Sequence, residues 1–441
     1  MCRTKPLLTI MGSTMGSITG AALVAALSLG HAQSPDVTIG GAGWMQIGKI
    51  EKSTVLQGDN DYNDNWMQNG GAQLNFSSRF DERWDGAFGF GVVGVHLARG
   101  SRSQANFWYP FFVPYVSEVR LTRTSEGFTD GSTFKLTLGN FGYGYNPDVK
   151  NLGQYLLRGY VYPGDILPGF GNVVGGVASY QAGAFKNDFI VKSENEHRPV
   201  YDVSVADVVT WTATDGFELG AGVNFYRVWR SNDAFANKNN DCPIADGEQC
   251  YILDSVGFDA GTNTTIYDTI SGSLSGTKLM ARFSLDPKKL FGLTGFGKSD
   301  LVLYGEAAVL GLTDYPKYYD DILRRIPVMV GFNFPMLGYL DHLSLEVEYY
   351  ASKNFSDINY TGQSGAWLPL TDFPATIADT KRDDWKWSVN ASKVIFGNLQ
   401  LSGQVASDHL RPGGSNHNPN GFEAMSTPKD WYWTAKLAYF F

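Results

Sequence analysis

The sequence predicts an all-β fold, a transmembrane antiparallel β-barrel of roughly 16 strands, with 14 or 18 strands as the alternatives and a short helix in a long loop. Apolar residues recur at every second position in many segments, and short connections alternate with long ones. No run after residue 32 approaches the ~20 apolar residues of a membrane helix. The 51 Gly, 28 Phe, 23 Tyr and 11 Trp also suit strands with one lipid-facing side, one water-facing side and aromatic residues at the interfaces.

The clearest alternation lies in the C-terminal segment, residues 430–441. Apolar residues occupy every second position from Trp431 to Phe441, so a strand here has one continuous apolar face. The same period predicts strands near residues 44–51, 71–81, 85–95, 113–123, 133–141, 173–181, 184–191, 202–213, 216–228, 278–285, 300–310, 325–334, 342–352, 384–395 and 397–408. Secreted β-sandwiches, propellers and solenoids also alternate in this way, but no repeat of fixed period is present.

The connections between these strands alternate in length. Long gaps fall at residues 52–70, 96–112, 142–172, 229–277, 311–324, 352–383 and 408–429, and short ones at 81–84, 181–183, 214–215 and 396. Membrane barrels have short turns at one end and long loops at the other, and an even strand number places both chain ends on the same side. Two connections depart from this alternation of short turns and long loops. The expected turn at 286–299 is long, and the expected loop at 192–201 is short.

The N-terminus predicts export through a signal peptide at residues 1–32, which leaves residues 33–441 for the barrel. Arg3 and Lys5 precede an apolar stretch that ends in Gly30-His31-Ala32, the small-x-small pattern of a cleavage site. A membrane-anchoring helix is the alternative, although glycines dilute the apolar stretch. Cleavage removes two positive charges and no acidic residue, so the formal net charge changes from -9 to -11.

The C-terminal strand, which ends on Phe441, resembles the closing strand of bacterial outer-membrane barrels. With the signal peptide and the loop asymmetry, the chain resembles outer-membrane β-barrels of the porin type. The resemblance implies a bacterial outer-membrane location, contact with membrane lipid and recognition of Phe441 by the barrel-assembly machinery. It also implies passive diffusion of small hydrophilic solutes or ions through a channel, with a homotrimer as the porin expectation.

Residues 142–172 form the connection of greatest functional interest. They follow the fifth candidate strand, where general porins carry a loop that folds inward and narrows the channel. A short helix is expected from Asn146, a capping residue followed by Pro147, to Gly159, a terminating residue. The resemblance implies that this loop constricts the pore; a lid or a surface helix is the alternative. The constriction candidates are Tyr143, Tyr145, Asp148, Lys150, Asn151, Tyr155 and Arg158.

The pore lining follows from parity: if the most apolar faces meet lipid, the residues between them face the interior. Burying charges in hydrocarbon costs several kcal/mol near the midplane, so a water-filled interior is expected. A network of paired charges that fills a narrower barrel is the alternative. The predicted lining residues are Glu118, Arg120, Lys135, Glu218, Asn224, Arg282, Tyr304, Glu306, Glu346, Glu348, Lys386 and Lys436.

The loops suggest further features. Cys242 and Cys250 are expected to form a disulfide in an oxidising envelope, with a metal site as the weaker alternative. Asp59 begins a spacing that resembles a calcium loop, but Asp64 and Gly70 replace the required Gly and Glu, so no metal is assigned. The net negative charge favours a cation preference. A sugar preference is the alternative, since tyrosines of the expected constriction could stack on sugars; they are Tyr143, Tyr145, Tyr155, Tyr160 and Tyr162.

Other function classes have less support. An enzymatic barrel needs an aligned catalytic constellation, and no His after residue 32 lies in a recognisable Ser- or Asp-containing motif. No P-loop, dinucleotide fingerprint or nucleic-acid-binding basic patch occurs, so neither a cofactor nor nucleic acid is expected. A transporter with a plug is disfavoured because only about ten residues separate the signal peptide from the first candidate strand. A structural or adhesive barrel that acts through its long outer loops remains the main alternative to a channel.

Overall fold

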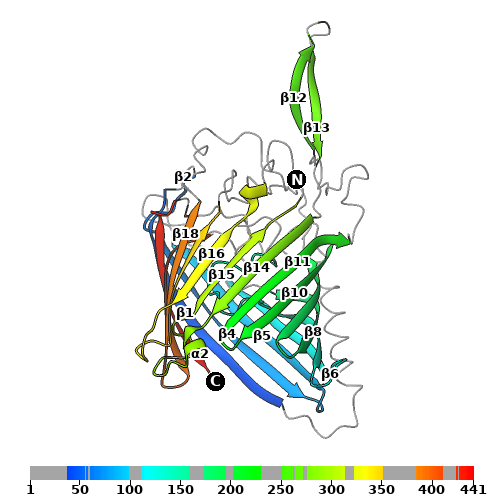
Figure 1. The fold of residues 1–441 in the computed structure, drawn as a ribbon. Coiled ribbons are helices and arrows are strands. Elements are labelled where there is room, and N and C mark those ends of the chain that lie inside the picture. The colour runs from blue at the N-terminus through cyan, green and yellow to red at the C-terminus, as the bar shows by residue number, and fades with distance from the viewer. Residues whose placement is uncertain are drawn as a thin grey trace, which may run out of the picture.

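The structure is a computed structural model that describes residues 37–54, 56–57, 60–98, 111–157, 172–194, 202–229, 251–259, 261, 264–271, 276–312, 322–350, 384–410, 424–425 and 427–441. It forms a closed antiparallel barrel of 16 strands (Figure 1). The barrel strands are β1 (Val37–Lys52), β4 (Trp66–Arg79), β5 (Trp84–Ala98), β6 (Phe111–Glu126), β7 (Thr133–Gly142), β8 (Asn172–Ala182), β9 (Phe185–Glu194), β10 (Asp202–Thr214), β11 (Phe217–Trp229), β14 (Gly276–Leu285), β15 (Leu303–Val309), β16 (Val328–Asn333), β17 (His342–Tyr349), β18 (Trp385–Ile395), β19 (Leu399–Ser407) and β20 (Trp431–Phe440). Each of the 16 expected strands is present.

Two small hairpins lie outside the barrel wall, and the sequence pattern did not reveal them. They are β2 (Leu56–Gln57) with β3 (Asn60–Asp61), and β12 (Tyr251–Asp259) with β13 (Thr264–Ser271). The β12–β13 hairpin projects from the end of the barrel with the long loops, and the C-terminus lies at the other end (Figure 1). The two ends of the barrel therefore differ as the connection lengths indicated.

The short helix is not where the sequence placed it. Among residues 143–157 the backbone forms turns and bends, so the helix expected from Asn146 is wrong over the described part of that segment. The helices within the described residues are α2 (Pro287–Phe291) and the 3-10 helix η2 (Ile322–Arg325). Asp286 caps α2 and Gly292 ends it with a φ of 61°. This helix explains why the turn at 286–299 is longer than the other turns.

None of the helices in the described part of the chain is long and apolar enough to cross a membrane.

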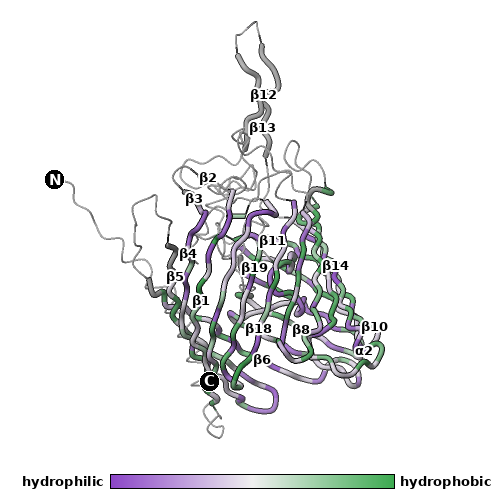
Figure 2. Tube along the Cα trace, turned by 90° about the vertical axis from the view of Figure 1, so that its left-hand side faces the viewer, coloured by the Kyte–Doolittle hydropathy of each residue, from purple (hydrophilic) through white to green (hydrophobic). Residues whose placement is uncertain are grey.

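The two faces of each strand differ as the period of two requires. On β14, Leu279 is 40% exposed on the outer surface, whereas the adjacent Lys278 and Met280 are 1% and 4% exposed. Hydrophobic and hydrophilic residues alternate along the strands in the same way around the barrel (Figure 2). Because a closed ring leaves no strand edge unpaired, every wall strand is hydrogen-bonded on both sides.

The ring closes between β1 and β20. Where the chain ends, the backbone N–H of Gly41 donates to the carbonyl of Phe441 at 2.9 Å, and the N–H of Phe441 donates to the carbonyl of Gly41 at 3.1 Å. A Cβ on Gly41 would lie 2.5 Å from the backbone oxygen of Gln73 and 2.6 Å from Cζ of the Phe441 ring. Gly41 is therefore required for the close approach of β1 to the C-terminal Phe441.

We expect Gly41→Val to lower the fraction of chains that close into a barrel, because overpacking at a site with no free space costs typically ~1–3 kcal/mol. The measurement is the mobility difference between heated and unheated protein on a denaturing gel after refolding into detergent. Gly43→Val is the matched control, since a Cβ there meets only one atom, the Gly71 oxygen at 4.0 Å. Equal folding yields for the two variants would contradict the prediction.

Candidate functional site

The candidate site is the segment of residues 143–157, called here the crossing segment, together with the strands it contacts. It leaves the end of β7 and reaches β17, which stands eight places from β7 in either direction around the ring of 16 strands. The backbone N–H groups of Lys150, Asn151 and Leu152 donate to Glu346 of β17. Since β7 and β17 lie on opposite sides of the barrel, the segment crosses the interior.

Glu346 is the first of two anchors for the crossing segment. Its Oε1 accepts from the N–H of Lys150 at 2.6 Å, and its Oε2 accepts from the N–H groups of Asn151 and Leu152 at 2.8 and 2.9 Å. The Tyr304 hydroxyl of β15 donates to Oε1 at 2.9 Å. Four donors thus replace water around a carboxylate that is 0% exposed, as burial of a charge requires.

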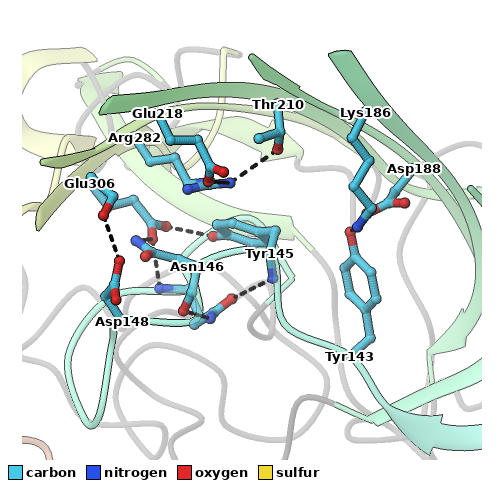
Figure 3. Close-up of polar contacts among 12 residues, drawn as sticks. Tyr143, Tyr145, Asn146, Asp148, Lys186, Asp188, Thr210, Glu218, Arg282 and Glu306 are labelled. Atoms are coloured by element: carbon cyan, nitrogen blue, oxygen red, sulfur yellow. Dashed lines mark hydrogen bonds and ion pairs between the residues drawn. The ribbon is translucent and has the colours of Figure 1, made fainter. Parts of the chain in front are cut away.

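Glu306 of β15 is the second anchor, and it also accepts from four donors. The hydroxyl of Tyr145 donates at 2.5 Å and the side-chain amide of Asn146 at 3.2 Å. The N–H groups of Gln154 and Tyr155 donate at 3.1 and 2.8 Å. Figure 3 shows Tyr145 and Asn146 directed at this carboxylate. Two acidic side chains of the wall therefore hold a loop that presents mainly backbone donors.

The backbone between the two anchors has a left-handed turn that aims the donors. Gly153 has a φ of 99° and Gln154 a φ of 60°, a conformation that costs side-chain-bearing residues free energy. A Cβ on Gly153 would also lie 2.7 Å from Cε of Met329, so the glycine permits close packing on β16. The backbone N–H groups before the turn, up to that of Leu152, donate to Glu346. Those after it, of Gln154 and Tyr155, donate to Glu306.

Three tyrosines of the crossing segment donate to acids of the wall. Tyr143 donates to Asp188 at 2.8 Å, Tyr145 to Glu306, and Tyr155 to Glu348 at 2.8 Å. Burial, reinforced by the charge of Asp188, raises the pKa of Tyr143, so this hydroxyl keeps its proton.

The Tyr145 and Tyr155 rings are buried, so they offer no face on which a sugar could stack. The expectation of sugar stacking is therefore wrong for these two residues. They bury their rings and hold the segment in place through their hydroxyl groups.

Hydrogen bonds to Asp408, the residue after β19, also hold the crossing segment. The side-chain amide of Asn151 donates to Asp408 at 2.5 Å, and the Tyr432 hydroxyl of β20 donates to the same carboxylate at 2.7 Å. Burial raises the pKa of Asp408, and these donors oppose the rise. His409 Nε2 lies 2.8 Å from Oε1 of Glu348, next to the bond from Tyr155. Residues that follow β19 thus form part of the same network.

The crossing segment also contacts β11 and β14. Asp148 accepts from the Ser284 hydroxyl at 2.7 Å, and the Asn224 amide donates to the carbonyl of Leu156 at 2.8 Å. Close by, Arg282 pairs with Glu218 at 2.7 Å and donates to Thr210 at 3.0 Å (Figure 3). The crossing segment is therefore bound at both ends and in the middle.

The structure divides the predicted lining residues into two groups. Those buried in the network under or beside the segment are Asn224, Arg282, Tyr304, Glu306, Glu346, Glu348 and Lys386. Those at least partly open to solvent are Glu118, Arg120, Lys135, Glu218 and Lys436. Of the expected constriction residues, Lys150 is exposed and donates its side-chain amine to the Pro147 carbonyl at 3.2 Å. Arg158, Cys242, Cys250 and the expected signal peptide lie outside the described residues.

The exposed group marks a part of the inner wall that the segment leaves open. The side chains of Glu118 and Arg120 on β6 are 30% and 27% exposed, whereas Glu306 and Glu346 are 3% and 0% exposed as residues. Arg120 pairs with Glu118 at 2.7 Å and with Asp85 at 3.5 Å, so charge along this wall is largely compensated. The interior is thus filled beside β14–β17 and reachable by water beside β6, and polar side chains of β1 and β4 such as Gln46 and Gln73 are also partly exposed.

The sequence reading missed Asp188, Asp408 and His409 of the network. Asp188 has the inward parity of β9, so the same period of two could have found it. Asp408 lies at the end of the predicted strand 397–408 with inward parity, so the same period could have found it too, whereas His409 lies just beyond that strand. Within the described part of the chain, no group of three or more His, Cys, Asp or Glu could hold a metal ion.

Comparison of the sequence with protein-family models and with curated proteins finds no match. Comparison of the structure finds bacterial porins. A mutant of Rh. blastica porin is 10% identical with a TM-score of 0.42, over 92% of this chain and 100% of that chain. Salmonella typhi OmpF in a complex with daunomycin is 10% identical with a TM-score of 0.45, over 92% and 98%. The closed 16-stranded ring itself defines the class of this protein, an antiparallel β-barrel.

Proposed function

We propose that the protein is an outer-membrane channel for the passive diffusion of small hydrophilic solutes or ions. The observation that carries the proposal is the unequal filling of the barrel. A ring of 16 strands is wide enough to enclose water, and the crossing segment covers one part of the wall while polar side chains of β1 and β4–β6 stay exposed. An apolar outer surface supports insertion into lipid.

The proposal includes the features implied by the resemblance to porins. Residues 1–32 direct export, Phe441 serves in recognition by the assembly machinery, and Cys242 and Cys250 form a disulfide in an external loop. A homotrimer is the proposed assembly. Support comes from the sequence patterns and, for Phe441, from its place at the seam between β1 and β20.

The exposed charges of the wall support weak selectivity. Glu118 and Arg120 compensate each other, Lys436 adds a positive charge, and the net charge of the chain is -9. We propose a modest cation preference, since a negative overall charge raises the local concentration of cations. A reversal potential measured across a salt gradient gives the sign, and a strong anion preference would contradict this proposal.

The experiment that tests the channel is single-channel recording in planar lipid bilayers with purified, refolded protein. Discrete and reproducible current steps that disappear after heat denaturation are the expected result. Protein that is folded by the gel-mobility criterion but produces no steps would overturn the proposed function.

An adhesive or structural role is the second candidate, favoured by the β12–β13 hairpin that projects beyond the barrel (Figure 1). Deletion of residues 251–271 separates the two functions. A channel keeps its conductance without the hairpin, whereas a barrel that acts through this hairpin loses surface binding and shows no conductance before or after the deletion.

A further inference from the structure

The wall left open by the crossing segment carries a row of uncharged amide side chains. The amide row consists of Gln46 on β1 and Asn69, Gln73 and Asn75 on β4, all partly exposed. Asn69 donates to Gln46 at 3.1 Å, and Gln73 donates to Asn75 at 2.7 Å. These four residues have the inward parity of their strands, opposite to the exposed Met45 and Ile47 of β1.

Two aromatic rings lie close against this wall because the residues paired with them are glycines. A Cβ on Gly71 would lie 2.6 Å from Cζ2 of Trp44, and a Cβ on Gly91 would lie 3.0 Å from the Tyr115 ring. Gly71 pairs with Trp44, and Gly91 pairs with Tyr115, across neighbouring strands. Each ring therefore packs closely on the backbone of a glycine in the neighbouring strand.

The rings and the amides form one continuous surface. The Tyr115 hydroxyl donates to Gln73 at 3.1 Å, and Trp44 is next but one to Gln46 on β1. From Asn69 to Asn75 the row spans seven residues of β4, and the six rises between them correspond to ~20 Å at ~3.4 Å per residue. Its length exceeds that of a single sugar ring and suits a short chain of them.

The chemistry of this surface suits uncharged, hydroxylated ligands. Each amide both donates and accepts hydrogen bonds, as a hydroxyl group does. Aromatic faces pack against the C–H faces of sugar rings, and the combination of apolar faces with a few placed polar groups is typical of ligand sites. The charges at the end of the row are paired, since Arg120 contacts both Glu118 and Asp85. The Lys436 amine lies over the Trp44 ring, 5.6 Å from its centre, as a cation–π contact that adds a hydrogen-bond donor next to the platform.

We propose that this wall is a binding surface for uncharged polyhydroxylated solutes, in particular short oligosaccharides, with Trp44 and Tyr115 as stacking platforms and the amide row as hydrogen-bonding partner. The inference rests on the proposed channel function and names its solute class. It assigns the sugar preference to β1, β4 and β6 in place of the buried tyrosines of the crossing segment.

The test is isothermal titration of the detergent-solubilised barrel with maltotriose, which requires no conductance. Wild-type protein is expected to give saturable binding, and Trp44→Ala is expected to weaken it about three- to tenfold, the range for loss of one aromatic contact. Trp66→Ala is the matched control, because Trp66 of β4 lies on the outer surface and packs on Trp433. No wild-type binding, or equal loss in both variants, would overturn the inference.

A second measurement separates this inference from the channel proposal. In planar bilayers, maltotriose is expected to block the wild-type current in a concentration-dependent manner, and Trp44→Ala is expected to relieve the block. A polyethylene glycol of similar size, which lacks hydroxyl groups along its chain, is expected to block less. A conducting barrel without sugar binding refutes the oligosaccharide surface alone, whereas Trp44-dependent binding without conductance refutes the channel alone.

Discussion

Replacement of Glu346 by alanine is expected to release the crossing segment and to give larger and noisier single-channel currents than those of the wild-type protein. The carboxylate accepts from three consecutive backbone N–H groups and from Tyr304. Hydrogen bonds to a charged group contribute about 1.5–3 kcal/mol each, and buried donors left without an acceptor carry a further desolvation penalty. Glu306→Ala removes the other four-donor anchor, so the double variant is expected to have the larger effect.

The measurement is conductance in planar bilayers, combined with exclusion of polyethylene glycols of increasing size. Glu118→Ala is the control, since Glu118 is also an acid of the inner wall but bonds to Arg120 and not to the crossing segment. This control is expected to change ion selectivity with little change in the exclusion size. Folded Glu346→Ala protein with the same conductance and exclusion size as the wild type would show that this anchor does not hold the segment.

Gly139→Ala is expected to have the largest effect on folding. Gly139 of β7 has a φ of 133°, and a Cβ there would lie 1.9 Å from the backbone oxygen of Val119. Its partner across the strand pair is Gly175, where a Cβ would lie 2.1 Å from the oxygen of Val191. Backbone strain of ~1–3 kcal/mol and overpacking of ~1–3 kcal/mol together predict destabilisation of roughly 2–6 kcal/mol.

The denaturant midpoint of the gel-mobility shift measures this effect in detergent or lipid vesicles. Gly403→Ala is a suitable control, because a Cβ at Gly403 meets only the Thr434 oxygen at an ordinary 3.6 Å. We expect its midpoint to stay within error of the wild type. A Gly139→Ala midpoint as high as that of Gly403→Ala would mean that β6 and β7 can separate locally without cost.

The barrel was predictable because its signals are local. The alternation from Trp431 to Phe441 needs only neighbouring residues to be recognised, and the same holds for Leu279 with Lys278 and Met280. The expected helix from Asn146 failed for the opposite reason. Its capping residues were plausible, but the segment satisfies its backbone donors on Glu306 and Glu346, residues that helix propensity does not include.

By itself, the sequence predicted a barrel of roughly 16 strands, the inward parity of the named lining residues and an alternation of short and long connections between the strands. The tertiary structure alone decided the path of the crossing segment and which inward residues water can reach. The bond between Tyr145 and Glu306 joins residues 161 positions apart, and such a contact leaves no periodic trace in the chain. Parity distinguishes inside from outside, but only the path of the loop separates Glu346, covered by backbone donors, from Gln73, open to the lumen.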